Sequence, residues 1–169
     1  MTTQNNKPEF LRLLEEHKLI IYKICNSYCK NVSDRDDLAQ EISYQLWRSY
    51  GHFNGTVKFS TWMYRVALNV AITFYRKTTN AGNIIQLAEP TNEPEDKKED
   101  STELEKNISM LQQFINELKE LEKALMILYL EEKKYTEISE ILGITETNVA
   151  TRISRIKEKL KQQFSTINK

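Results

Sequence analysis

The sequence contains few of the residues that make tight turns, with 4 glycines and 3 prolines in 169 residues. Proteins built from β-hairpins need many more of both, so that class is excluded. The chain also lacks a run of about 18 apolar residues, the length that a membrane-spanning helix requires, and its first seven residues are polar, unlike a signal peptide. Apolar residues recur instead at spacings of three and four among many Leu, Ile, Glu and Lys residues, which predicts a soluble, cytoplasmic, all-α protein.

Residues that bind metals are scarce as well. Two cysteines, Cys25 and Cys29, lie one helical turn apart, and the only two histidines, His17 and His52, are remote in sequence. Such a cysteine pair supplies at most half of a tetrahedral zinc site. We therefore predict buried, reduced thiols, no metal and no other cofactor.

Charge is segregated along the sequence although the formal net charge is zero. Residues 42–88 contain no Asp or Glu, in a chain with 24 such residues. Residues 89–105 contain eight carboxylates against two lysines, and residues 150–169 contain six Lys or Arg against one Glu. Two basic segments separated by an acidic one predict a nucleic-acid partner, which the overall charge conceals.

The N-terminal part predicts three amphipathic helices that form one small bundle. The first is a single long helix whose apolar stripe runs from Phe10 to Tyr28. Ser33 or Asp34 is expected to cap the second helix, and Ser60 or Thr61 the third, with a loop at residues 51–55 between them. The expected inward faces of the second and third helices are Leu38, Ile42, Leu46, Met63, Val66, Ala67, Val70 and Phe74.

Residues 80–102 are predicted to be a flexible, solvated linker, since they contain two of the three prolines and many carboxylates. The prolines disfavour the alternative, a charged surface helix. The chain is thus divided into a domain at 1–79, a linker at 80–102 and a second helical domain at 103–169. The first helix of the second domain is expected to bury an apolar stripe of Leu104, Ile108, Leu111, Ile115 and Leu118.

Residues 135–152 have the layout of a helix-turn-helix. Thr136 would cap a short helix, and Gly143 stands where the chain must take a left-handed conformation, which glycine adopts at least cost. Thr145 would cap the following helix, whose exposed face is expected to carry short polar groups and arginine. Such a face suits the major groove of DNA, although helical hairpins without a DNA role share the layout. The residues predicted to face DNA are Thr147, Ala150, Thr151, Arg152, Ser154 and Arg155.

Three segments together resemble one family. Residues 34–42 (DRDDLAQEI) resemble the acidic D-L-x-Q-E helix of sigma factor region two, and residues 59–69 (FSTWMYRVALN) resemble the F-x-T-W-L-Y-R-I-A-x-N run that follows it in extracytoplasmic-function (ECF) members. Residues 135–155 resemble the helix-turn-helix of region four. The resemblance implies a bacterial transcription initiation factor that lends promoter recognition to core RNA polymerase, catalyses nothing and is controlled by an anti-sigma factor.

The same resemblance implies which residues meet each partner. The acidic helix would dock on the polymerase through Asp37, Gln40, Glu41, Tyr44 and Trp47, although a solvated, capped helix face explains the carboxylates equally well. The third helix and its preceding loop would open and hold the minus-ten promoter element, with an extruded base held by the loop at 54–60. Trp62 could either stack on an unpaired base or pack in the core. The predicted minus-ten residues are Asn54, Lys58, Ser60, Trp62, Arg65, Asn69, Thr73 and Arg76.

The sequence departs from the family at the recognition helix. The usual lysine before the Ser-Arg pair is Ala150 here, and the serine is Thr151. Ala150 can contact only a thymine methyl group, so we expect a minus-35 preference that differs from lysine-bearing relatives.

Two other functions are compatible with part of the sequence. A stand-alone helix-turn-helix regulator with a helical sensing or dimerisation domain would account for residues 135–155, but not for the motifs at 34–42 and 59–69. An enzyme acting on nucleic acid would need clustered carboxylates or histidines, and the only dense carboxylates fall in the predicted linker.

Overall fold

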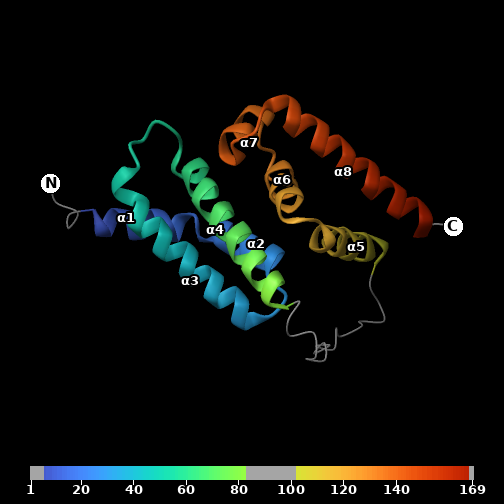
Figure 1. Ribbon diagram of the computed structural model, residues 1–169, viewed down its shortest axis with the longest axis horizontal. Coiled ribbons are helices and arrows are strands. Elements are labelled where there is room, and N and C mark those ends of the chain that lie inside the picture. Colours follow the sequence, from blue (N-terminus) through green and yellow to red (C-terminus); the bar gives the residue numbers. More distant parts are fainter. Residues whose placement is uncertain (1–5, 83–101, 168–169) are drawn as a thin grey trace.

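The computed structural model describes residues 6–82 and 102–167. Within these residues the chain forms eight α-helices, one short 3-10 helix and no strand, which confirms the predicted all-α class. Helices α1–α4 form the N-terminal half and α5–α8 form the C-terminal half (Figure 1). None of the described helices is long and apolar enough to span a bilayer.

The chain begins with two helices where one was predicted: α1 (Lys7–Glu16) and α2 (Lys18–Tyr28). The break falls at His17, whose ring packs 5.2 Å from the ring of Phe59 and whose Nδ1 lies 2.9 Å from the carbonyl oxygen of Leu13. The prediction of a single helix is therefore wrong. Nothing in the local sequence marks the break, because no glycine or proline is present there and the contact that fixes His17 comes from a residue far along the chain.

Two predicted caps are also misplaced. Helix α3 (Val32–Ser49) is capped by Asn31, whose side-chain oxygen accepts a hydrogen bond of 2.8 Å from the Asp34 amide, and not by Ser33 or Asp34. A 3-10 helix, η1 (Tyr50–His52), and a loop follow, and α4 (Phe59–Gly82) begins before both of its predicted caps. Asparagine is as good an N-cap as serine or aspartate, so adjacent candidates could not be ranked from sequence.

The core of the N-terminal half contains the predicted inward residues and a second set beside them. Leu38, Ile42 and Leu46 of α3 are fully buried, as are Met63 and Ala67 of α4, with Val66, Val70 and Phe74 half-buried. Helix α4 also buries a neighbouring stripe that was not predicted, consisting of Tyr64, Leu68 and Ala71. A helix that buries two adjacent stripes must have neighbours on both sides.

The C-terminal half consists of α5 (Glu103–Glu117), α6 (Glu120–Leu130), α7 (Tyr135–Leu142) and α8 (Glu146–Ile167). Thr102 caps α5 through a 3.3 Å hydrogen bond from the Glu105 amide to its side-chain oxygen. Helix α6 is buried on every side from Lys123 to Leu128, so it forms the centre of this half. The predicted stripe of α5 is only partly buried: Ile115 and Leu118 enter the core, whereas Leu104 and Ile108 lie in its exposed N-terminal turns.

The two halves pack against each other. Helix α6 contacts α2 and α4, α7 contacts α4, and α5 contacts α2, so one continuous hydrophobic core extends through both halves. In Figure 1, α4 lies between α3 on one side and α6 and α7 on the other. Of the predicted linker, residues 80–82 belong to α4 and Thr102 caps α5, while residues 83–101 lie outside the described residues.

Candidate nucleic-acid interface

The predicted helix-turn-helix is formed by α7 and α8. Gly143 ends α7 in a left-handed conformation (φ 68°), and Thr145 caps α8 by accepting a 3.1 Å hydrogen bond from the Asn148 amide, both as predicted. Ile138 and Ile141 of α7 pack with Val149 of α8 in the core. The predicted cap at Thr136 is wrong, because α7 begins at Tyr135, with Lys134 in the cap position. These contacts fix α8 relative to α7 and leave one long face of α8 open.

The open face of α8 carries the residues predicted to read DNA. Thr147, Thr151, Ser154 and Arg155 are exposed, while Ala150 and Arg152 are half-buried at the edge of the face. In Figure 1 this helix forms the outer edge of the C-terminal half, away from α1–α3. Thr151 donates its hydroxyl proton back to the carbonyl oxygen of Thr147 (2.9 Å). The hydroxyl oxygen of Thr151 keeps acceptor lone pairs, so this side chain can offer a base either a hydrogen-bond acceptor or a methyl group.

Sequence reasoning missed one polar residue of this face. The side-chain oxygen of Asn148 accepts a 2.9 Å hydrogen bond from Nε of Arg152, one turn further along α8. The bond holds the guanidinium at the margin and leaves its terminal nitrogens free for a phosphate. The i, i+4 spacing of an amide and an arginine on a predicted helix was the available signal.

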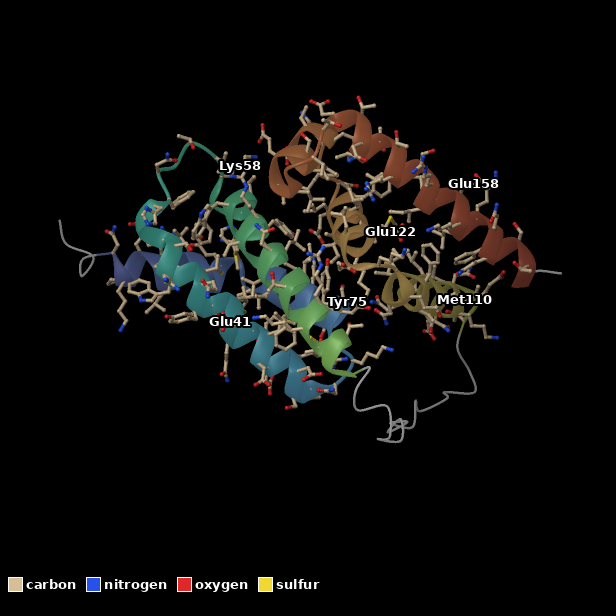
Figure 2. All side chains as sticks on the ribbon, in the orientation of Figure 1. Glu41, Lys58, Tyr75, Met110, Glu122 and Glu158 are labelled. Carbon is tan, nitrogen blue, oxygen red and sulfur yellow. The ribbon has the colours of Figure 1, made fainter. Side chains whose placement is uncertain are left out.

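On α3, the residues predicted to bind polymerase form one exposed face. Asp37, Gln40 and Glu41 are exposed, and Tyr44 and Trp47 keep 56% and 40% of their surface accessible. The Trp47 ring rests 5.1 Å from the Phe10 ring, and it borders a hollow of about 400 Å³ that Arg48 and Tyr50 also line. Glu41 lies on the side of α3 far from the C-terminal half (Figure 2). The predicted aromatic and acidic groups are thus brought together on one accessible surface.

On α4, four residues of the predicted minus-ten set form an exposed row. Arg65, Asn69, Thr73 and Arg76 all have exposed side chains at successive turns of the helix. Lys58 is exposed where the loop enters α4 (Figure 2), and Asn54 holds the loop by accepting hydrogen bonds from the amide (3.1 Å) and the hydroxyl (2.8 Å) of Thr56. Ser60 is half-buried.

Trp62 belongs to an aromatic cluster at the head of that row. Its ring lies 5.2 Å from Phe53, 5.5 Å from Phe59 and 6.3 Å from Tyr50, in tilted arrangements typical of packed aromatics. The side chain is half-buried, so it is part of the core and still has an accessible surface. The three partner rings were not predicted as site residues, although their aromatic spacing around a short loop was visible in the sequence.

Both arginines of the α4 row contact the C-terminal half. A terminal nitrogen of Arg65 donates to the carbonyl oxygen of Glu140 in α7 (2.8 Å), and Nε of Arg76 pairs with the Glu120 carboxylate in α6 (2.9 Å). The hydrogen bond from Arg76 lowers the pKa of Glu120. The two charged groups suited to phosphate are therefore held by carbonyl and carboxylate oxygens of the same chain.

Two family descriptions match the sequence: sigma-70 region 2 over residues 13–81 and sigma-70 region 4 over residues 108–160. The chain is 31% identical over 175 aligned residues to the ECF RNA polymerase sigma factor SigW of Bacillus subtilis, which covers 95% of this chain and 91% of SigW. The chain belongs to the ECF family of RNA polymerase sigma factors.

Other relatives agree with this assignment. The sigma factor is 26% identical to RNA polymerase sigma factor SigV of Bacillus subtilis, with 96% of this chain and 95% of SigV aligned. Two solved structures share its fold at 17% identity: CnrH in complex with the cytosolic domain of CnrY (TM-score 0.68, 97% of this chain, 92% of that chain) and RpoE in complex with the anti-sigma factor NepR from Bartonella quintana (TM-score 0.64, 96% and 98%). Region 2 thus corresponds to α1–α4 and region 4 to most of α5–α8.

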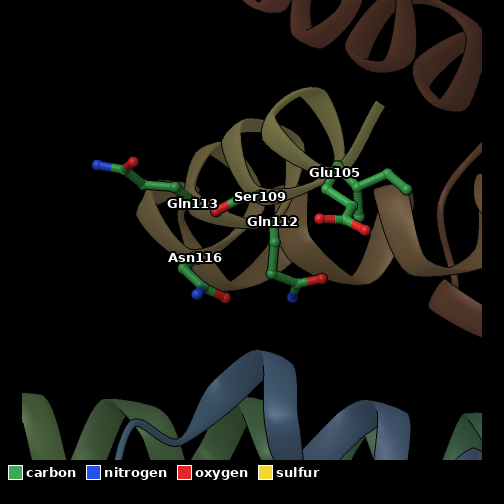
Figure 3. A pocket seen from close by; sticks show the side chains of 6 residues that line it. Glu105, Ser109, Gln112, Gln113 and Asn116 are labelled. Carbon is green, nitrogen blue, oxygen red and sulfur yellow. The ribbon is translucent and has the colours of Figure 1, made fainter. Parts of the chain in front are cut away.

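The described residues also include two cysteines and a hollow along α5. Across residues 6–82 and 102–167, no group of three or more His, Cys, Asp or Glu side chains is arranged to hold a metal ion. Cys25 and Cys29 are free and buried, as predicted, and burial raises the pKa of their thiols to about 12 and about 11. A hollow of about 470 Å³ along α5 is lined mainly by uncharged polar groups such as Gln112 and Asn116 (Figure 3).

Proposed function

We propose that this sigma factor binds core RNA polymerase through α3, opens and holds the minus-ten element with α4, and reads the minus-35 element with α8. The observation that carries the proposal is the presence, in one chain, of two exposed polar and basic helical rows and one separate acidic and aromatic face. Neither a stand-alone DNA-binding regulator nor a nuclease needs all three surfaces.

The α3 face is suited to a protein partner. Tyr44 and Trp47 expose large aromatic surfaces next to the carboxylates of Asp37 and Glu41, a composition typical of the centre and rim of protein interfaces. A solvated acidic helix has no use for exposed aromatic rings. We therefore assign Asp37, Gln40, Glu41, Tyr44 and Trp47 to polymerase docking.

The α4 row is suited to a separated DNA strand. Arg65 and Arg76 supply phosphate contacts, Asn69 and Thr73 supply hydrogen bonds, and Trp62 supplies an aromatic surface next to the loop. Proteins that hold single strands combine a basic path with aromatic stacking in this way. The acid-free segment 42–88 removes repulsion along the path.

The open face of α8 is suited to the major groove of duplex DNA. Short side chains at Thr147, Ala150, Thr151 and Ser154 let the backbone approach base edges, while Arg155 projects far enough to reach a guanine edge or a phosphate. Arg152, held at the margin by Asn148, is positioned for phosphate only. This division assigns sequence preference mainly to Arg155 and to the small Ala150.

The proposal also covers the regulatory partner of this sigma factor and the cell compartment in which it acts. The solved sigma factors of the same fold are complexes with the cytosolic domain of CnrY and with the anti-sigma factor NepR. We propose an anti-sigma partner for this chain too, action in the cytoplasm and no catalysis of its own. The polymerase supplies the chemistry of RNA synthesis, and the sigma factor supplies binding and DNA opening.

Run-off transcription with core polymerase on a promoter library tests the proposal. We expect transcripts from a defined subset of promoters only when the sigma factor is added, because core polymerase alone does not select promoters. Tight, specific operator binding by the free protein without any effect on core polymerase would instead favour a stand-alone regulator.

A further inference from the structure

The hollow beside Trp47 lies where the end of α3 meets α1. It has a volume of about 400 Å³, and small-molecule sites occupy roughly 300–1,000 Å³, so one nucleotide-sized group fits in it. The residues that line it come from α3, from η1 and from the position before α1: Asn6, Trp47, Arg48, Tyr50, Gly51 and His52. Most of them have no part in the polymerase and DNA surfaces proposed above.

The lining combines aromatic rings with cationic and amide groups. Trp47 keeps 40% of its surface accessible and Arg48 is exposed, and no carboxylate is among the described residues that line the hollow. Just outside the lining, Glu9 and Arg12 of α1 act on the Tyr50 phenol with opposite charges, so together they add no net charge. An indole, a guanidinium and an amide can stack on a base, neutralise a phosphate and hydrogen-bond to a base edge.

A continuous band of aromatic rings joins the hollow to the head of the α4 row. The Phe10 ring lies 5.1 Å from Trp47 and 5.0 Å from Tyr50. The Tyr50 ring in turn stacks on Phe53 at 6.2 Å and lies 6.3 Å from Trp62. Figure 1 shows the end of α3 and the start of α4 at the same end of region 2, joined by the loop. The band therefore fixes the hollow relative to the loop that precedes α4.

The charge around the hollow favours DNA over a protein side chain as its occupant. The acid-free segment 42–88 contains the end of α3, η1, the loop and α4. The carboxylates of the α3 face, Asp37 and Glu41, belong to earlier turns of that helix. A DNA strand that follows the α4 row to the loop can thus continue to the hollow without meeting a carboxylate of this segment.

We propose that the hollow holds one unpaired base of the promoter strand, next to the minus-ten element. The base stacks on Trp47 while Arg48 contacts its phosphate, and Asn6 and His52 hydrogen-bond to its edge. The inference rests on the proposed function of α4 and adds a second base site, separate from the loop at 54–60. Promoter preference then extends to a nucleotide that flanks the minus-ten element.

Abasic-site scanning with the holoenzyme tests this site. The promoter used has an unpaired minus-ten region, and each nucleotide on either side of the element is replaced in turn by one that lacks its base. The affinity of the holoenzyme is then measured for each DNA. For the wild type we expect one flanking position at which loss of the base weakens binding about tenfold, the effect of one base–aromatic stack.

Two variants change the hollow without touching the proposed minus-ten residues. Gly51→Leu fills it, because a Cβ on this lining glycine meets no atom within 4 Å and its backbone is not left-handed. This variant should bind the intact promoter about tenfold more weakly and lose nothing more at the abasic position. Arg48→Ala with His52→Ala removes two exposed side chains and should weaken binding to the intact promoter several-fold.

Lys30→Ala is the matched control, because it removes an exposed positive charge next to the opposite end of α3. It should keep the wild-type abasic profile. Affinity for core polymerase is measured separately and should be unchanged in all three variants, and circular dichroism should show unchanged helix content.

A flanking abasic effect that disappears in Gly51→Leu supports the site. Equal abasic profiles in the wild type and both hollow variants overturn it, and saturable binding of free nucleoside monophosphates would then assign the hollow to a small molecule. Weaker binding of both variants to core polymerase also overturns it, since the hollow then receives a polymerase side chain. Abasic sites inside the minus-ten element test α4 separately: a loss there without a flanking effect removes only this inference, whereas no loss there means that the proposed function of α4 has failed.

Discussion

Helices α4 and α8 are the two proposed DNA-binding helices, and their surroundings differ. Helix α4 packs on both sides, against α2 and α3 and against α6 and α7, and both arginines of its exposed row contact the other half. Helix α8 packs on one side only, and its open face makes no hydrogen bond or ion pair with region 2 among the described residues. One DNA surface is therefore engaged within the protein and the other is available.

The difference suggests an order of events. The open face of α8 can meet duplex DNA without breaking such contacts, whereas a DNA strand along α4 must compete with the hydrogen bonds of Arg65 to Glu140 and of Arg76 to Glu120. Helix α3, with the proposed polymerase-binding face, lies on the far side of α4 from region 4 (Figure 1). The predictions below test whether the two helices are controlled independently.

The largest expected effect is on polymerase docking. Asp37→Ala combined with Gln40→Ala should abolish association with core polymerase and leave helix content unchanged, since both side chains are exposed. Gln113→Ala with Glu117→Ala removes the same chemical groups from exposed α5 and should bind normally. If a pull-down with core polymerase recovers the α3 double variant to the same extent as the wild type, the docking assignment is wrong.

The next effect concerns the reading of DNA by α8. Arg155→Ala should cost about 1–3 kcal/mol and relax base preference at one or two minus-35 positions. Arg152→Ala should reduce transcription from all promoters by a similar factor, because Arg152 is proposed to contact phosphate only. It should also reduce the slope of log affinity against log salt concentration by about one unit. Promoter-library transcription at several salt concentrations distinguishes the two patterns.

Replacing Ala150 by Lys in the same library should shift the preferred sequence, because a long donor then stands where there is now a methyl group. Two results together would contradict the proposal that the open face of α8 enters the major groove. These are that Arg155→Ala reduces transcription from every promoter by the same factor, and that Ala150→Lys leaves the promoter preference unchanged.

A smaller effect is expected at the turn that orients α8. Gly143 has φ 68°, and a Cβ added to it would meet no neighbouring atom within 4 Å. The only expected cost of Gly143→Ala is therefore backbone strain, which should reduce the free energy of unfolding by about 1–2 kcal/mol. Gly51→Ala is the control, because this glycine has equally open space without the left-handed backbone. Urea unfolding should show a loss for Gly143→Ala alone; equal losses at both glycines would contradict the strain argument.

The smallest expected effect is that the thiols of Cys25 and Cys29 do not react with a thiolate-specific reagent in the folded protein. Burial raises the pKa of Cys25 to about 12 and of Cys29 to about 11, so at pH 8 both remain thiols and should resist a thiolate-specific reagent until the protein unfolds. Because the unfolded thiols ionise near pH ~8.5, this contribution to stability is present below that pH and is lost as pH rises further. Rapid labelling of the folded protein at pH 8, at the rate of the urea-unfolded chain, would contradict this.

The fold class and the exposed rows could be predicted from sequence because each depends on local periodicity. Leu38, Ile42 and Met63 were placed correctly inside, and Gly143 and Thr145 correctly at the turn. The break at His17 and the buried stripe of Tyr64, Leu68 and Ala71 could not be predicted. These depend on contacts between distant segments, which change neither spacing nor composition.

The same reason explains what was missed at the candidate site. Lys123 follows Glu122 near the start of α6 and has the sequence context of a solvated surface lysine. Only the packing of α6 against α2 and α4 buries it. The contacts of Arg65 and Arg76 with region 4 were likewise invisible, although their exposure on α4 was predicted.

The most direct test of the account is site-specific crosslinking from α4 and α8 to promoter DNA. A photoreactive residue is placed at Thr73 or at Ser154, both exposed, and DNA is added with and without core polymerase. The account predicts that free protein crosslinks from Ser154 and hardly at all from Thr73, and that polymerase turns on crosslinking from Thr73 to the minus-ten element. Equal crosslinking from Thr73 with and without polymerase would contradict the claim that α4 is engaged within the free protein.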